Sequence, residues 1–130
     1  MRRRRVARSQ SGIRDARASV WHTIETSMNR EEAIQVLGDC RHKIDELDLR
    51  ILELLNARTR VVEQIGRIKS ELAWPIYEPK REDEVFRNVT ENNSGPLPAE
   101  AVKRVFERII DEMRAVQKLR MVAQDRDQTK

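Results

Sequence analysis

Residues 37–72 read LGDCRHKIDELDLRILELLNARTRVVEQIGRIKSEL, and this stretch decides the fold. In a seven-residue register, apolar residues fill ten of eleven positions in two rows along one helix face. The first row is Leu37, Ile44, Ile51, Arg58, Ile65 and Leu72, and the second is Cys40, Leu47, Leu54, Val61 and Ile68. These two rows, called the seam below, predict a long helix that pairs with another helix.

Arg58 is the one charged residue in the seam. A guanidinium group is costly to bury in a helix interface unless an anion meets it. Two interpretations are therefore open. Either the side chain extends out of the seam into solvent, or it binds a carboxylate or a phosphate. The choice decides whether the helix belongs to a plain coiled coil or to an enzyme.

The whole pattern predicts an all-α fold with three helices per protomer and no strand. The long helix is expected over residues 30–72, the short one over 79–91, and the medium one from about residue 98 to beyond 121. Asn29 is the expected N-cap of the long helix. Because three such helices bury little apolar surface within one chain, we expect self-association.

The length predicts one domain and a monofunctional protein. Residues 28–125 are expected to form the helical domain and residues 126–130 a polar C-terminal tail. Residues 1–27 hold seven arginines and two acidic residues, which gives a net charge of +5. We expect this basic extension to be disordered. An organelle transit peptide and a natural start at Met28 are the alternatives.

Composition argues against several other classes of protein. The whole chain has a net charge of +4, so residues 28–130 carry −1 and offer no broad basic surface to nucleic acid. No apolar run approaches the ~20 residues of a membrane span. Cys40 is the only cysteine, and its seam position predicts a small buried side chain in a reducing cytoplasm. His22 and His42 lack partners at metal-binding spacing, so no metal is expected.

Two cations on the long helix share nearly one face. Lys69 follows Arg58 by eleven residues, an axial gap of about 16 Å. The two side chains are long enough to converge on one small dianion. The alternative for Lys69 is a solvated lysine near a helix end.

Polar residues interrupt the other two helices as well. Glu78, Arg81 and Glu82 would share one edge of the first turn of the short helix. The plain alternative is a charged, well-capped helix start. Gln117 continues the apolar stripe of the third helix, where a buried amide needs partners. Its alternative is an exposed, frayed helix end.

Arg41 stands 17 residues before Arg58, which places it about 25 Å away along the helix and about 100° around it. It cannot reach a small ligand held at Arg58 of the same chain. An antiparallel partner helix would bring the Arg41 of a second copy to that place. If Arg41 is functional, the site is shared between protomers.

Residues from about 30 to 121 resemble the all-helical class of chorismate mutases. The matching segments are RHKIDELD at 41–48, Arg58, GRIK at 66–69, EPKRE at 78–82, and Gln117. The resemblance implies an intertwined homodimer that rearranges chorismate to prephenate for phenylalanine and tyrosine biosynthesis in the cytoplasm, without cofactor or metal. Catalysis would then rest on holding a chair-like conformer and stabilising charge as the ether bond breaks.

The resemblance also implies which residues hold the ends of the substrate. Arg58 and Arg41 of the partner subunit would bind the two carboxylates, where a planar fork suits bidentate contact. Lys69 and Gln117 would donate hydrogen bonds to the ether oxygen. Some relatives carry glutamate in place of Gln117, which donates only when protonated. An amide donates at any pH, so we expect no acid-limited activity from this position.

The resemblance implies that the remaining matches surround the ring hydroxyl of the substrate. The resemblance implies that Glu82 accepts a hydrogen bond from this hydroxyl, with Arg81 and Glu78 in support. Glu78 stands where several relatives have aspartate. Some relatives also place a serine four residues before the glutamine, where this chain has Met113. We therefore expect one substrate contact to be missing or replaced.

Two other functions remain open. An isochorismate–pyruvate lyase would share the helical scaffold and the arginines, but lyase relatives tend to lose acidic groups at the positions of Glu78 and Glu82. A non-catalytic helical dimer with a nucleic-acid-binding arm would explain the seam and the basic residues 2–5. The nearly neutral body argues against it, because phosphate binding needs many cations along one face.

Overall fold

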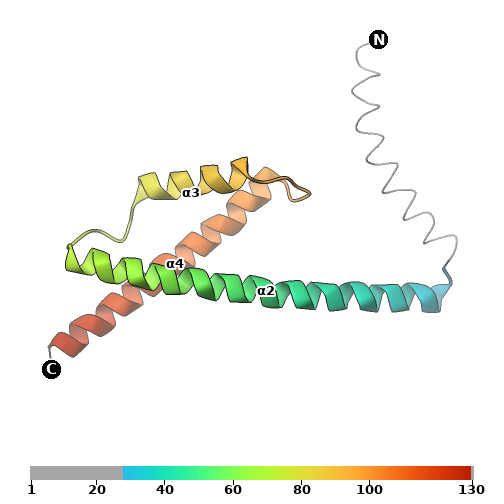
Figure 1. The fold of residues 1–130 in the computed structure, drawn as a ribbon, viewed down its shortest axis with the longest axis horizontal. Helices are drawn as coiled ribbons and strands as arrows, with labels where there is room; N and C mark the ends of the chain where they lie inside the picture. The colour runs from blue at the N-terminus through green and yellow to red at the C-terminus, as the bar shows by residue number, and fades with distance from the viewer. Residues whose placement is uncertain (1–27, 130) are drawn as a thin grey trace, which may run out of the picture. The chain divides into compact units, whose positions relative to one another are not determined.

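The computed structural model describes residues 28–129, and within them the chain forms three helices: α2 (Arg30–Glu71), α3 (Pro79–Glu91) and α4 (Ala99–Gln128) (Figure 1). The predicted all-α class and the three predicted helices are confirmed, and this part of the chain has no strand. The basic extension and His22 lie outside the described residues. Among residues 28–129, no helix has the length and hydropathy needed to cross a membrane.

A reciprocal capping pair starts α2. The backbone N–H of Glu32 donates to Asn29 Oδ1 at 2.9 Å, and the N–H of Asn29 donates to Glu32 Oε2 at 3.2 Å. This arrangement is a capping box, which satisfies two helix-end donors at once. The prediction that Asn29 caps the long helix is confirmed.

The chain divides into two compact units within α2, between Ile51 and Leu52. In the first unit, no residue from Met28 to Ile51 is buried. The seam residues Ile44 and Leu47 are 54% and 52% exposed. Cys40, predicted to be buried, is also exposed, because nothing in the described part of its own unit covers the seam there.

The end of α2 is closed by backbone hydrogen bonds around Ala73. The N–H of Trp74 donates to the carbonyl of Lys69 at 2.8 Å, and the N–H of Ala73 donates to Ser70 at 3.2 Å. This pair of bonds is a Schellman motif, which requires a left-handed residue at its corner. Ala73 supplies that residue with a φ of 54°. The helix thus ends at the predicted place, and its last turn is held in a fixed shape.

The second unit, from Leu52 onward, contains the core. Its buried apolar side chains are Val62, Val102, Ile110 and Met113, contributed by α2 and α4. Gly66 is also buried, and a Cβ added there would lie 3.5 Å from Gln117 Cγ, so α2 and α4 approach closely at this point. Four buried apolar side chains make a small core for one chain.

The third helix runs beyond residue 121, as the pattern predicts. It continues to Gln128, into the polar segment 126–130. Its last residues are polar but compatible with a helix, and the N–H of Thr129 still donates to the carbonyl of Asp125 at 3.2 Å. Polarity therefore marks the solvated end of this helix and not its boundary.

Candidate active site

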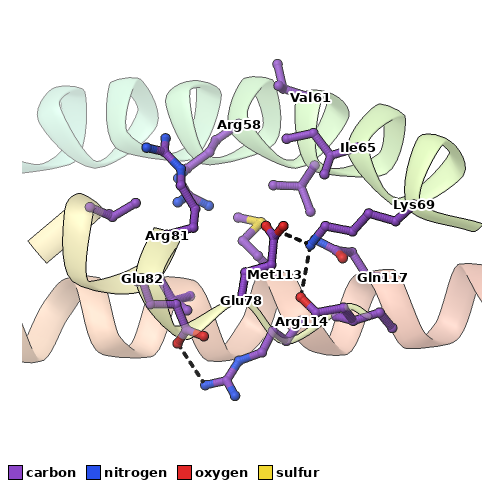
Figure 2. A pocket seen from close by; sticks show the side chains of 14 residues that line it. Arg58, Val61, Ile65, Lys69, Glu78, Arg81, Glu82, Met113, Arg114 and Gln117 are labelled. Carbon is purple, nitrogen blue, oxygen red and sulfur yellow. Dashed lines mark hydrogen bonds and ion pairs between the residues drawn. The ribbon is translucent and has the colours of Figure 1, made fainter. Parts of the chain in front are cut away.

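A cavity of about 320 Å³ lies within the second unit, between the C-terminal part of α2, the connector that follows it, α3 and α4 (Figure 2). Six of the seven predicted site residues line it: Arg58, Lys69, Glu78, Arg81, Glu82 and Gln117. Apolar side chains such as Val62, Ile65 and Ile110 form much of the remaining wall. A small apolar cavity with a few convergent polar groups is typical of a small-molecule site.

Lys69 is held at one end of this cavity by the connector. Its side chain is buried, with 5% of the residue exposed, so it is not a solvated helix-end lysine. Its Nζ donates to the carbonyl oxygen of Ile76 at 2.9 Å and lies 3.2 Å from Glu78 Oε2. An ammonium group has three donors, so these two partners leave one N–H for a ligand.

Gln117 lies near Lys69 in the cavity wall (Figure 2). It is 7% exposed, which excludes the alternative of a frayed helix end. Its Oε1 is buried and has no hydrogen-bond partner among the described residues. In a cavity wall, such an acceptor is available to a hydrogen-bond donor of a ligand.

Two guanidinium groups line the cavity at its other end. Burial lowers the pKa of Arg58 below its ordinary value, and the positive charge of Arg81 lowers it further. Arg58 is half-buried, so it does not extend freely into solvent. Arg81 also forms an exposed ion pair with Glu84 at 3.1 Å. Two adjacent cations beside a cavity favour binding of an anion.

Glu78 and Glu82 reach the cavity from the start of α3. Glu78 is the N-cap residue, and its carboxylate pairs with Lys69 instead of capping the helix. The side chain of Glu82 is 19% exposed, and its Oε1 lies 3.4 Å from Nη2 of Arg114. Its Oε2 is buried without a hydrogen-bond partner in the described residues. The carboxylate of Glu78 thus pairs with Lys69, and the carboxylate of Glu82 keeps one oxygen available as a hydrogen-bond acceptor.

Sequence reasoning missed Arg114, which also lines the cavity. Its position three residues before Gln117 puts the two side chains on neighbouring parts of one α4 face, and that spacing was the available signal. With Arg114 included, the lining contains four cationic and two anionic side chains. The cavity wall therefore carries a net charge of about +2, which suits a small dianion.

Arg41 is the predicted site residue that does not line the cavity. It is exposed on α2, in the first unit of the chain. Met113 does line the cavity, at the position where a substrate hydrogen bond was expected to be missing. The nearby hydroxyl of Thr59 lies 3.4 Å from the sulfur of Met113 and 2.7 Å from the carbonyl oxygen of Leu55. Within residues 28–129 no three His, Cys, Asp or Glu side chains gather as metal ligands do.

The chain is similar to known proteins in sequence and in fold. The family model described as chorismate mutase type II matches residues 40–118. A solved chorismate mutase from Thermus thermophilus (form II) superposes with a TM-score of 0.61 and 38% identity, over 67% of this chain and 96% of that one. The Helicobacter pylori chorismate mutase in complex with prephenate gives a TM-score of 0.61 and 30% identity, over 65% and 91% of the two chains.

Several similar curated proteins are much longer than this chain. A bifunctional chorismate mutase/prephenate dehydratase from Neisseria gonorrhoeae is 41% identical over 78 residues, which is 60% of this chain and 21% of that protein. Two more proteins with this name, from Aquifex aeolicus and Stutzerimonas stutzeri, match this chain over 26% and 24% of their own length. The similarity is thus confined to about a quarter of each.

Proposed function

We propose that this chain, which belongs to the chorismate mutase type II family, rearranges chorismate to prephenate in the cavity described above. The reaction would serve phenylalanine and tyrosine biosynthesis. Within one molecule, the ether C–O bond breaks while a new C–C bond forms, and no proton or group leaves. The protein therefore needs to select a folded conformer and to stabilise the charge that develops on the ether oxygen.

The observation that carries this proposal is the charge of the cavity wall. Chorismate is a dianion, and the side chains that line the cavity carry a net charge of about +2. Glu84 and Asp111, outside the lining, pair with Arg81 and Arg114, whereas Arg58 forms no ion pair with any described residue. Arg58 is placed to bind one carboxylate in a bidentate manner. The free N–H of Lys69 and the side-chain NH2 of Gln117 are the donors we assign to the ether oxygen. The unpartnered Oε1 of Gln117 is an acceptor and has no part in that contact.

Glu82 is the residue we assign to the ring hydroxyl. Its Oε2 is a buried acceptor without a partner among residues 28–129, and a hydroxyl donor from a ligand would satisfy it. Arg81 and Glu78 would support this end of the site. The retained carboxylates Glu78 and Glu82 favour the mutase over the lyase.

The test is an assay of chorismate consumption with identification of the product, on the full chain and on a chain that starts at Met28. Conversion to prephenate by both supports the proposal. A purified, folded protein that leaves chorismate unchanged contradicts it. If pyruvate release from isochorismate is the faster reaction, the chain is a lyase instead.

We also propose that the enzyme is a cytoplasmic, intertwined homodimer in which Arg41 of the partner subunit completes each site. Exposed apolar residues along α2 support dimerisation, among them Ile44, Leu47 and Leu54, which are 54%, 52% and 70% exposed in the single chain. Arg41 does not line the cavity of its own chain. The cytoplasmic location is supported by the free thiol of the only cysteine, Cys40.

Subunit mixing tests whether the site is shared. Arg41→Ala and Arg58→Ala should each be nearly inactive alone. After subunit exchange in a one-to-one mixture, heterodimers hold one site with both arginines, so the mixture should recover about a quarter of wild-type activity. No recovery, although mass spectrometry detects the heterodimer, would show that Arg41 acts within its own chain or not at all.

A further inference from the structure

We infer that Arg114 is a positioning residue for the reaction, which holds Glu82 so that one carboxylate oxygen stays free for the substrate hydroxyl. This inference rests on the proposed function. Arg114 lies outside the sequence motifs quoted above and was not expected to have a role. It is identified by its contacts in the cavity wall.

The guanidinium of Arg114 is fixed from three sides. Its Nη2 donates to Asp111 Oδ1 at 2.6 Å and lies 3.4 Å from Glu82 Oε1. Its central carbon lies 5.4 Å from the centre of the Tyr77 ring, within the range of a cation–π interaction. The side chain is 34% exposed, so these contacts lie partly out of water. Together they hold the cation against the carboxylate of Glu82 (Figure 2).

The contact uses one side of Glu82 and leaves the other side free. Arg114 faces Oε1, whereas Oε2 is buried and has no partner among the described residues. Apart from Arg114, no described cation pairs with Glu82: Arg81 pairs with Glu84, and Lys69 pairs with Glu78. Arg114 is therefore the only described ion-pair partner that fixes this carboxylate. Without it, Glu82 would be a poorly oriented acceptor.

The experiment is a double-mutant cycle between Arg114 and Glu82. The four proteins are wild type, Arg114→Met, Glu82→Gln and the double variant, and the readouts are KM and kcat for chorismate and the Kd for prephenate. The hydroxyl is present in both substrate and transition state, so a lost contact should act mainly on KM. We expect Arg114→Met to raise KM and the prephenate Kd by about tenfold, with kcat changed less than about twofold.

The decisive comparison is the second arm of the cycle. If Arg114 acts through Glu82, then Arg114→Met should change KM by less than about twofold once Glu82 is already glutamine. An equal, multiplicative loss in both backgrounds would overturn the inference, because Arg114 would then act on the dianion directly by its charge. Wild-type kinetics for Arg114→Met would overturn it as well.

Two controls separate this role from stability. Arg108→Met removes an ion pair to Glu112 of 2.8 Å on the same helix, where both side chains are mostly exposed, and should leave KM unchanged. If Arg114→Met does not fold, Arg114→Lys keeps the charge and takes its place in the cycle. If the wild type binds prephenate but does not convert chorismate, the proposed function is wrong. The Kd values for prephenate of the four proteins would still test the role of Arg114.

Discussion

The two halves of α2 carry one apolar seam but have different surroundings. Up to Ile51, none of the described residues of the helix is buried. From Leu52 on, Val62, Gly66 and Lys69 are buried, while the seam residues Leu54 and Ile68 remain 70% and 55% exposed. The seam is therefore left open in both halves. The second half packs within its own chain through a different stripe.

That second stripe lies one position around the helix from the seam. Its partly or fully buried members are Leu55, Thr59, Val62, Gly66 and Lys69, spaced alternately by four and three residues. Such spacing keeps them on one helix face. The difference shows that α2 has two distinct faces. Its own chain covers the cavity face, and a second copy is proposed to cover the open seam. Arg58 belongs to the seam rows and yet lines the cavity.

The largest expected effect comes from placing a charge in the open seam of the first half. Leu47→Glu would bury a carboxylate in both copies of a dimer, at a cost of about 4 kcal/mol or more, which raises the dimer Kd about a thousandfold. We expect loss of the dimer by light scattering, together with loss of activity.

Leu49→Glu is the matched control for this change. Leu49 is 63% exposed on the same helix half but lies outside the seam rows. The control should remain dimeric and active. If Leu47→Glu behaves like Leu49→Glu, the first half of the seam is an ordinary exposed surface and the proposed dimer is wrong.

The second-largest expected effect comes from Arg58→Leu, which should change activity and stability in different directions. Arg58→Leu removes a charge-assisted clamp on a carboxylate and should lower kcat/KM by about a thousandfold. The lowered pKa of Arg58 shows that the fold disfavours its charged form. Arginine side chains stay protonated in proteins, so the charge and its cost persist throughout the pH range of ordinary assays.

Stability should therefore move in the opposite direction from activity. With the charge removed, we expect the unfolding midpoint of Arg58→Leu to stay the same or rise by the equivalent of about 1 kcal/mol. The gain should be equal at mildly acidic and mildly basic pH. Arg60→Leu, at an exposed position two residues away, should keep full activity. A clear loss of stability in Arg58→Leu would instead assign Arg58 a structural role.

The sequence predicted the helices because they depend on residues close together in the chain, and the family resemblance indicated most of the site residues. The apolar period defined α2, and Asn29 and Pro79 marked two helix starts. The spacing of Arg58 and Lys69 predicted that both face one small ligand, and both line the same cavity. The burial of Thr59 and Gly66 on the cavity face of α2 was not predicted, because these residues give that face no hydrophobic pattern.

Arg114 was missed for a related physical reason. Its importance comes from Glu82 and Tyr77, which belong to α3 and to the connector before it, and such contacts depend on the packing of α3 against α4. The left-handed Ala73 was also unexpected, since glycine is the usual residue at that corner. Sequence periodicity reports which face of a helix is apolar, but not which polar side chains meet when helices pack.

The smallest expected effect concerns the corner that closes the cavity-facing half of α2. Ala73 adopts a φ of 54°, where an L-residue with a Cβ is disfavoured and glycine is not. Ala73→Gly should therefore raise the free energy of unfolding by about 1 kcal/mol, as measured by urea denaturation. Dimer affinity and kcat should not change, because the Schellman bonds lie within one chain. The same substitution inside a helix, Ala115→Gly at an exposed position of α4, should lower stability by a similar amount. Equal losses in both variants would mean that the corner at Ala73 carries no strain that glycine relieves.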